Sequence, residues 1–319
     1  MERRDIAVVG ASTGGVEALR LFVENMPEDY PGTVFVVMHI GPVSLLPEIL
    51  SRSSKLPTLS AEDGKRYEPN HIYIAPPNRH LLIADGHMKL SAGARENGHR
   101  PAVDALFRSA ARELRSRVAG VVLSGALDDG SAGLFAVKSR NGIAIVQDPK
   151  EAGAPDMPRN AMKNVTVDYC LPIAEIPPLL ATLARGEAGA KEPAIDAGDM
   201  NLEKEELVAD PPSAERQISM ACPECDGPLY ESKDGHLAHF RCNVGHAYSP
   251  LSLSAKHGEA LERALWVAVR TLNERITLHR EMLKRDRNDG EDALFRRLAE
   301  SVKIAEQDVQ LLRQIIERI

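Results

Sequence analysis

Continuous apolar runs alternate with amphipathic stretches along the first part of the chain. Four of these runs predict buried strands: 6–9, 33–38, 118–123 and 143–146. Between such runs, apolar residues recur at helical spacing, as they do over 102–114. Strands that lack polar alternation and are separated by helices are typical of a parallel sheet with both faces covered. We therefore expect an α/β fold with a doubly wound, mostly parallel, Rossmann-like sheet.

Residues 80–91 have a different pattern from the buried runs. Two short, partly apolar segments flank Asp85-Gly86, a dipeptide that is typical of tight hairpin turns. We expect a β-hairpin at this point, inserted between the second strand of the sheet and the helix over 102–114.

The pattern changes again after residue 186. Between Glu187 and Asp210 the chain carries eight acidic residues and two lysines, which account for −6 of the net charge of −7. This polar stretch, rich in Ala, Gly and Pro, predicts a linker. From residue 251 onward two apolar stripes at helical spacing, separated by Asn288-Asp289-Gly290, predict a helical hairpin or two arms of a coiled coil. The expected division is an α/β domain over 1–186, an acidic linker over 187–217, a small module over 218–250 and a helical hairpin over 251–319.

Composition narrows the class of protein further. Hydrophobic residues make up 43% of the 319 residues and charged residues 27%, which is ordinary for a globular protein. There is no apolar run of about 20 residues and no signal-peptide pattern, so we expect a cytoplasmic protein without membrane insertion. Four cysteines do not suggest a disulfide framework, and no basic field points to a nucleic-acid partner.

The first predicted strand leads into a glycine-rich turn, Gly10-Ala-Ser-Thr-Gly-Gly15, and then into a helix. Ser12 therefore lies at the N-terminus of a helix, whose free N–H groups favour negative charge. This position suits a nucleophile whose reaction forms an oxyanion, and Gly10-x-Ser12-x-Gly14 matches the nucleophile elbow of esterases. A phosphate-cradling turn of a nucleotide-binding unit is the alternative, and the stretch alone does not decide between the two.

Two further polar sites follow buried strands. His39 comes directly after the second strand, and Asp128-Asp129 follow the run over 118–123. Because active sites of parallel sheets lie beyond the carboxyl ends of the strands, we expect these side chains to lie close to Ser12. His39 would then act as the base, and Asp129 would fix its tautomer and stabilise the imidazolium. Each feature alone is more often structural, since Asp-Asp-Gly is a common helix cap, but the conjunction favours a hydrolase.

Two features of the sequence argue against the α/β-hydrolase fold and against a nucleotide site. The order Ser, His, Asp differs from the Ser, Asp, His order of α/β-hydrolases. A dinucleotide site would need an acidic residue after the second strand, where this chain has His39. Backbone N–H groups near Thr13 and near Gly125-Ala126 are the candidate oxyanion donors.

Several motifs with these groups occur in order along residues 4–185. They are Val8-Val-Gly-Ala-Ser-Thr-Gly-Gly15, His39, Ile74-Ala-Pro-Pro77, His99-Arg-Pro-Ala-Val-Asp104 with Phe107, Ser124-Gly-Ala-Leu-Asp-Asp-Gly130 and Met157-Pro-Arg159. This region resembles the chemotaxis protein-glutamate methylesterase family, the CheB catalytic domain. The resemblance implies a doubly wound α/β domain that hydrolyses glutamyl methyl esters on methyl-accepting chemoreceptors, releases methanol and in some members deamidates glutamines.

The resemblance also implies roles for individual residues. Carried over by position, the catalytic residues are Ser12, His39 and Asp129, with Asp128 as the second choice for the acid. Thr13 and Ala126 would supply oxyanion N–H groups, and Met157 and Arg159 would lie near the mouth of the site. The family's Gly-Met-Gly is replaced here by Gly125-Ala126-Leu127, which could reshape the oxyanion wall or the cleft. This departure keeps open a second interpretation, a catalytically weak or inactive adaptor that binds receptors.

The family usually carries a phosphorylation-controlled receiver domain ahead of the esterase domain. Here the first strand of the esterase domain begins at Ile6, so we expect a chain without a receiver domain, controlled by other means. The expected partners are methyl-accepting chemoreceptors or similar membrane signalling proteins.

The module over 218–250 carries Cys222-Pro-Glu-Cys225 and Cys242-Asn-Val-Gly-His246. This spacing suits tetrahedral zinc, and four ligands leave no open position, so we expect structural zinc and no cofactor for catalysis. The alternatives are a knuckle that has lost its metal and packs its sulfurs as small hydrophobic groups, or substitution by His236 or His239 as a ligand. Cys170, at the end of an apolar run, is interpreted as a core residue.

The helices over 251–319 have little besides each other to pack on. They are therefore candidates for homodimerisation or receptor docking. Trp266, the only tryptophan of the chain, is the candidate anchor of this contact.

Overall fold

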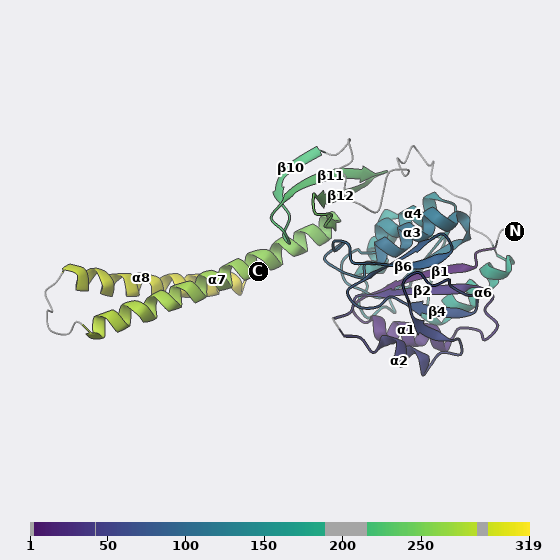
Figure 1. Ribbon diagram of the computed structural model, residues 1–319, viewed down its shortest axis with the longest axis horizontal. Coiled ribbons are helices and arrows are strands. Elements are labelled where there is room, and N and C mark those ends of the chain that lie inside the picture. Colours follow the sequence, from purple (N-terminus) through teal and green to yellow (C-terminus); the bar gives the residue numbers. More distant parts are fainter. Residues whose placement is uncertain (1–2, 42, 189–215, 286–292) are drawn as a thin grey trace. The chain divides into compact units, whose positions relative to one another are not determined.

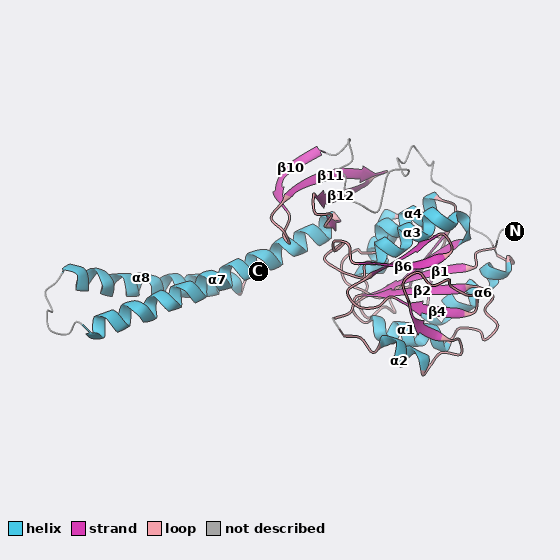
Figure 2. Cartoon of the chain, viewed as in Figure 1, coloured by secondary structure: helices cyan, strands magenta, loops and turns pink. Residues whose placement is uncertain are grey.

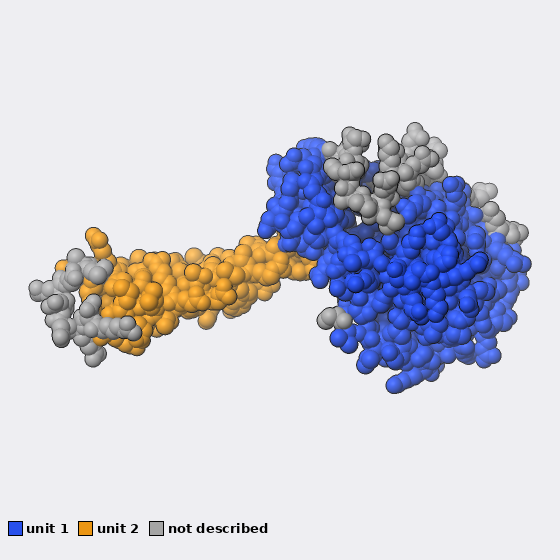
Figure 3. Space-filling model, viewed as in Figure 1, with its two compact units in different colours: residues 1–253 blue, residues 254–319 orange. Residues whose placement is uncertain are grey.

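The computed structural model describes residues 3–41, 43–188, 216–285 and 293–319. The chain forms two compact units, residues 1–253 and residues 254–319, which Figure 3 distinguishes by colour. The predicted acidic linker over 187–217 lies almost entirely outside the described residues. The predicted domain boundaries stay predictions.

A seven-stranded sheet forms the centre of the first unit, and every neighbouring pair in it is parallel. Figure 2 shows strands of this sheet in magenta, with helices in cyan around them. In sheet order the strands are β3 (Thr58–Ser60), β4 (His71–Ile74), β2 (Thr33–Met38), β1 (Ile6–Ala11), β7 (Val118–Val122), β8 (Ile143–Gln147) and β9 (Tyr169–Leu171). All six residues of β1 are buried, which explains why its sequence shows no alternation. The sheet grows from β1 toward β2 and later from β1 toward β7, so the strand order reverses there, the usual place for a site in such folds.

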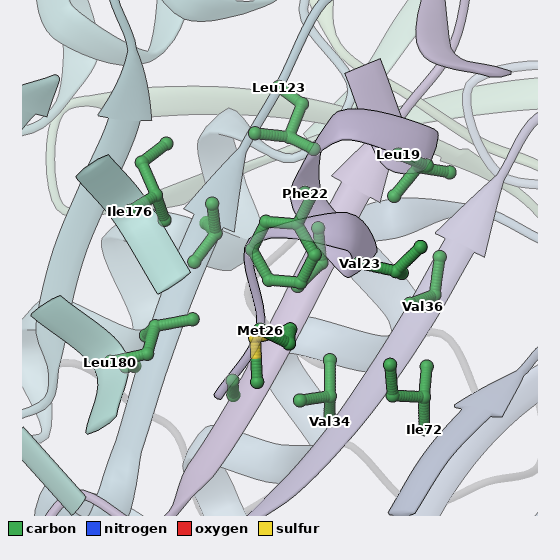
Figure 4. Packing of buried hydrophobic residues seen from close by; sticks show 14 of the residues in the cluster. Leu19, Phe22, Val23, Met26, Val34, Val36, Ile72, Leu123, Ile176 and Leu180 are labelled. Atoms are coloured by element: carbon green, nitrogen blue, oxygen red, sulfur yellow. The ribbon is translucent and has the colours of Figure 1, made fainter. Parts of the chain in front are cut away.

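Helices cover both faces of this sheet (Figure 1). One face packs against α1 (Gly15–Glu24), α2 (Leu46–Ser51) and α6 (Ile176–Arg185). The other packs against α3 (Val103–Leu114), α4 (Ser131–Ser139) and α5 (Asp156–Asn164). Figure 4 shows Phe22 of α1 in the middle of the first layer, and its side chain is fully buried. The prediction of an α/β fold with a helix-covered parallel sheet is confirmed.

Two smaller features complete this part of the chain. The hairpin of β5 (His80–Ala84) and β6 (His87–Ser91) turns at Asp85 and Gly86, which have φ values of 52° and 73°. Positive φ at both positions is the signature of the predicted tight turn. Single 3₁₀ turns at Arg115–Arg117 and Ile173–Glu175 lead into β7 and α6.

Residues 216–248 form a four-stranded antiparallel sheet within the first unit. Its strands are β10 (Arg216–Ala221), β11 (Pro228–Asp234), β12 (Leu237–Cys242) and β13 (Ala247–Tyr248). Two cysteines, Cys222 and Cys242, are buried in its small core together with Tyr248. The module pairs with the larger sheet domain along the turn before α3, since the N–H of Asn97 donates to the carbonyl of Ala247 at 2.7 Å.

The second unit contains most of α7 (Pro250–Arg285) and all of α8 (Ala293–Ile316), which lie side by side (Figure 1). Val269 and Ile276 of α7 form a buried cluster with Ala305 and Val309 of α8. Trp266 is 49% exposed, and its proposed part in dimerisation or docking stays a prediction. Among the helices that the structure describes, none is both long enough and apolar enough to cross a bilayer.

Candidate active site

Ser12 is the first residue after β1, and its position is set by backbone bonds to the neighbouring strand end. Its N–H donates to the carbonyl of Ser124, which follows β7, at 2.9 Å. Its own carbonyl accepts the N–H of Gly15 at 2.8 Å, which closes the turn into α1. Gly14 has a φ of 73°, and a Cβ there would lie 2.8 Å from Ser124 Oγ. The turn therefore needs glycine at this position, and it holds Ser12 over the carboxyl edge of the sheet.

His39 lies directly after β2 and connects the other two predicted residues. Its Nδ1 is 3.0 Å from Ser12 Oγ, and its Nε2 is 2.6 Å from Asp129 Oδ2. The aspartate can only accept, so we assign the proton to Nε2, which leaves Nδ1 to accept the hydroxyl proton of Ser12. The side chains of His39 and Asp129 are 7% and 3% exposed. The structure thus brings together the three side chains that sequence reasoning selected.

Asp129 is held by several donors besides His39. Its Oδ2 also accepts the N–H of Val103 at 2.7 Å, and its Oδ1 accepts Asn97 Nδ2 at 2.9 Å. Burial alone would raise the pKa of Asp129, but the hydrogen bond and charge of His39 and these donors outweigh it and hold the pKa below its usual value. The carboxylate is therefore charged at neutral pH and can stabilise a protonated His39.

Three polar residues around Ser12, His39 and Asp129 were not assigned a role from the sequence. Asn97 bridges Asp129 and Asp104, with its Nδ2 2.9 Å from a carboxylate oxygen of each. Burial and the nearby charge of Asp129 raise the pKa of Asp104 well above its usual value. The ring of His99 stacks on His39, with centroids 3.5 Å apart and planes 6° apart. The sequence indicates only a turn at Asn97-Gly98, directly before the His99–Asp104 motif, and a turn dipeptide carries no signal of a contact with Asp129.

Asp128 is oriented toward a different partner. Its Oδ1 accepts the hydroxyl of Ser249 at 2.7 Å, and the side chain is 6% exposed. Burial raises the pKa of Asp128 to about 6. The hydrogen bonds of the two carboxylates thus favour Asp129 as the partner of His39, in line with the ranking from the sequence.

The raised pKa of Asp128 predicts a pH-dependent cost to stability. The folded chain binds this proton more tightly than the unfolded chain, so the free energy of unfolding falls as pH rises from about 4 through 6. An Asp128→Asn variant keeps an acceptor for Ser249 but cannot ionise. We expect it to be more stable than the wild type by up to about 3 kcal/mol at pH 8, with a smaller difference at pH 5. Urea unfolding at both pH values measures this, and an equal difference at pH 5 and pH 8 would contradict the assigned cause.

The turn after β7 runs beside the nucleophile. A Cβ on Gly125 would lie 2.9 Å from Ser12 Cβ, so glycine is required for this approach. The N–H of Gly125 is taken by the carbonyl of Ala154 at 2.9 Å and is not an oxyanion donor. Within the described part of the chain, the N–H groups of Thr13 and Ala126 donate to no other group. Both are therefore open to a substrate oxygen.

Leu127, which replaces a glycine of the resembled family, has a φ of 62°. The turn thus keeps a left-handed conformation that glycine adopts freely and leucine does not. The carbonyl of Leu127 accepts Asn160 Nδ2 from α5 at 2.7 Å, which holds the turn.

Met157 and Arg159 both belong to α5 but have different surroundings. Met157 is fully buried, and its N–H donates to the carbonyl of Gly125 at 2.9 Å. Its sulfur occupies the space that a Cβ on Gly125 would take, so it braces the turn beside Ser12. Arg159 is exposed. Their proximity to substrate stays a prediction.

The four-stranded module brings together Cys222, Cys225, Cys242 and His246, whose ligand atoms all lie within 4.8 Å of one another. Cys225 Sγ is 3.6 Å from Cys242 Sγ, and Cys242 Sγ is 3.5 Å from His246 Nδ1. Ligands around one tetrahedral zinc are separated by about 3.5–3.8 Å, given Zn–S and Zn–N bonds of about 2.3 and 2.0 Å. These residues could therefore hold a metal ion, with His246 Nε2 oriented by Glu224 at 3.3 Å.

Two other cysteine and histidine predictions have different outcomes. His236, considered as a substitute ligand, lies edge-on to Phe135 with ring centroids 5.3 Å apart. Among the described residues, the group that could hold a metal ion includes neither His236 nor His239. The interpretation of Cys170 as a core residue is wrong, because its side chain is exposed. It belongs to β9, an edge strand that pairs on one side only.

The fold and this geometry define a class of protein. A parallel α/β sheet carries, at the point where its strand order reverses, a serine in contact with a histidine whose other nitrogen contacts a buried aspartate. This arrangement is typical of hydrolases that use a serine nucleophile, and the chain order of the three residues differs from that of the α/β-hydrolase fold.

Comparison with known proteins makes the class specific. Residues 7–180 match the family model described as CheB methylesterase. The chain is 38% identical over 179 residues to protein-glutamate methylesterase/protein-glutamine glutaminase 1 of Geobacter metallireducens, covering 54% of this chain and 49% of the relative. It is 36% identical to a putative protein of that name from Leptospira interrogans, covering 55% of this chain and 93% of the relative.

A solved structure agrees with these relatives. The crystal structure of the Thermotoga maritima CheB methylesterase catalytic domain superimposes with a TM-score of 0.54 and 34% sequence identity, covering 56% of this chain and 98% of that one. The chain belongs to the CheB methylesterase family, as its motifs predicted. The matched region spans about half of the Geobacter relative, and residues beyond 180 lie outside the family match.

Proposed function

We propose that this protein is a protein-glutamate methylesterase that hydrolyses methyl esters of glutamate side chains in chemoreceptor-type proteins and also deamidates glutamine side chains. The observation that carries the proposal is the contact of His39 with both Ser12 and Asp129 in a chain of the CheB methylesterase family. The relatives' name combines the two activities, which share one acyl-transfer chemistry and differ in the leaving group.

The proposed reaction begins with acylation of Ser12. As Ser12 Oγ attacks the ester carbonyl carbon, its proton passes to His39 Nδ1, and the charge of Asp129 stabilises the imidazolium. The N–H groups of Thr13 and Ala126 would bind the oxyanion of the tetrahedral intermediate. The intermediate then collapses to a glutamyl ester of Ser12, and His39 protonates the departing methoxide to give methanol.

Deacylation reuses the same groups. Water takes the place of methanol, gives its proton to His39 Nδ1 and attacks the acyl carbon. The second tetrahedral intermediate collapses, Ser12 recovers its proton from His39, and the glutamate carboxylate leaves. With a glutamine substrate the first leaving group is ammonia in place of methanol, and every later step is identical.

The proposed substrates are methyl-accepting chemoreceptors or similar membrane signalling proteins, met at their cytoplasmic face. A receptor-type helical peptide with one glutamyl methyl ester and one glutamine tests the proposal. Mass spectrometry should find the ester converted to acid, with glutamine converted more slowly. If the peptide binds but neither side chain changes, the adaptor function replaces the esterase function.

We further propose that the cysteine and histidine group binds structural zinc. We expect protein prepared under reducing conditions to contain about one zinc ion per chain. A Cys242→Ser variant should lose most of this zinc, because a site with three ligands binds the ion weakly. Metal analysis by mass spectrometry after dialysis measures both. A metal content below a tenth of the protein concentration in freshly prepared wild type would favour the metal-free knuckle. The proposed hydrolysis itself uses no cofactor.

A further inference from the structure

The side chain of Asn97 lies between the catalytic carboxylate and the start of α7. It is 4% exposed, and its Nδ2 donates to Asp129 Oδ1 and to Asp104 Oδ2, each at 2.9 Å. An asparagine amide has nearly the same shape when its oxygen and nitrogen are exchanged. In the exchanged orientation its oxygen would face two carboxylates, so something must hold the donating end toward Asp129.

Two serines at the beginning of α7 supply that constraint. Asn97 Oδ1 accepts the N–H of Ser249 at 2.9 Å and the hydroxyl of Ser252 at 2.8 Å. Ser252 is 1% exposed, so water does not compete for these bonds. With its oxygen occupied by two donors, the amide presents its nitrogen to Asp129. The orientation of this donor is therefore set from residues outside the family match.

The same segment also holds the other side of the acidic turn. Ser249 Oγ donates at 2.7 Å to Oδ1 of Asp128, the residue directly before Asp129 in the chain. Asn97 is fixed through its backbone as well, because its N–H donates to the carbonyl of Ala247 at 2.7 Å. Residues 247–252 are thus hydrogen-bonded to Asn97, which donates to Asp129, and to Asp128, which precedes Asp129 in the chain.

The position of this segment depends on the metal-ligating group. Ala247 follows His246 directly, and the N–H of Cys242 donates to the carbonyl of His246 at 3.0 Å. Tyr248 lies with its hydroxyl 3.4 Å from Cys222 Sγ. The ligand group therefore fixes the segment that carries the two serines.

We propose that Ser249 and Ser252 are positioning residues of the active site, which act on Asp129 through Asn97 and Asp128. This rests on the proposed function, because it gives the serines a part in that site's reaction. They fix the carboxylate that orients His39, so their loss lowers the reactivity of Ser12 without changing how substrate binds.

A purely structural role exists and predicts a different result. Ser249 Oγ accepts the N–H of Ser252 at 3.0 Å, and Ser252 Oγ accepts the N–H of Ser249 at 2.9 Å, so the two serines also cap α7 reciprocally. Loss of a cap lowers the unfolding temperature but leaves the chemistry of Ser12 in the folded protein unchanged. Reactivity of the folded enzyme therefore separates the two roles.

The test measures Ser12 reactivity in the full-length protein. A fluorophosphonate probe labels an activated serine, since Ser12 Oγ displaces fluoride from phosphorus, and it needs no knowledge of the substrate. For Ser252→Ala we expect the labelling rate and kcat to fall about tenfold, with KM unchanged. Ser252→Thr restores the hydroxyl and most of both rates. Ser254→Ala, an exposed serine of the same helix turn, is the matched control and stays at the wild-type rate.

Several outcomes would overturn the proposal. If Ser252→Ala and Ser254→Ala have the same labelling rate and kcat, Ser249 and Ser252 act only as helix caps. The same conclusion follows if Ser252→Ala lowers these rates and Ser252→Thr does not restore them. If Ser252→Ala does not fold, Ser249→Ala decides. It keeps the backbone donor to Asn97 and loses the bond to Asp128 together with the side-chain bonds to Ser252. An unchanged labelling rate there overturns the proposal. A wild type that labels rapidly but releases no methanol contradicts the proposed function and leaves the positioning test standing.

Discussion

Replacing Ser12 with alanine should reduce hydrolysis of glutamyl methyl esters by about 10⁴- to 10⁶-fold, to the level that binding and oxyanion contacts alone provide. The hydroxyl is the group in contact with His39 Nδ1 at 3.0 Å, and alanine leaves the base with nothing to activate except water. Alanine fits the site because Ser12 is held by its backbone bonds to Ser124 and Gly15, which the substitution keeps. The fold and the unfolding temperature should therefore be unchanged.

The measurement compares kcat/KM of Ser12→Ala and wild type on the methylated receptor peptide, with circular dichroism as the check on folding. The Thr13→Ala variant is the matched control, since it changes the adjacent side chain and keeps the backbone N–H proposed for the oxyanion. We expect that control to stay close to wild type. Activity of Ser12→Ala within tenfold of wild type, in a preparation free of other esterases, would remove Ser12 from the mechanism.

Replacing Asp129 with asparagine should lower kcat by about 10³- to 10⁴-fold with little change in KM. Asparagine can donate its Nδ2–H to His39 Nε2, which lies 2.6 Å from the aspartate oxygen, and this forces the ring proton onto Nδ1. A protonated Nδ1 cannot accept the proton of Ser12, so the base is lost while its position is kept. The stabilising charge for the imidazolium is lost as well.

Asp128→Asn is the control for this substitution, because it neutralises the neighbouring carboxylate whose hydrogen-bond partner is Ser249. Its kcat should stay close to that of the wild type. Stopped assays of both variants on the methylated peptide, together with fluorophosphonate labelling of Ser12, provide the comparison. If Asp128→Asn were the more damaging change, the roles of the two carboxylates would have to be exchanged.

The sequence predicted the central sheet and the three strand-end residues because both follow from local patterns. Continuous apolar runs identify parallel strands, and the carboxyl ends of such strands meet at one edge, so Ser12, His39 and Asp129 could be placed together without the structure. Short or polar elements were harder to predict from the sequence. The edge strand β3 and the helix α5, with Pro158 in its first turn, carry too few apolar residues to stand out.

The part that neighbouring residues play in the site depends on tertiary contacts, which no local sequence pattern indicates. Asn97 has a φ of 52° in a turn that reads only as a loop, yet it contacts Asp129, 32 positions later in the chain. Ser249 and Ser252 read as a helix start, and their bonds to Asp128 and Asn97 appear only in the fold. Cys170 was misread because an apolar run at a sheet edge has one face exposed.

The most direct measurement of the proposed function is methanol release from membranes that carry methylated chemoreceptors, using the full-length wild-type protein and Ser12→Ala in parallel. We predict that the wild type releases methanol in proportion to enzyme concentration and that Ser12→Ala releases it at the rate of membranes alone. Wild-type enzyme whose Ser12 is labelled by the fluorophosphonate but which releases no methanol would contradict the assignment of glutamyl methyl esters as its substrate.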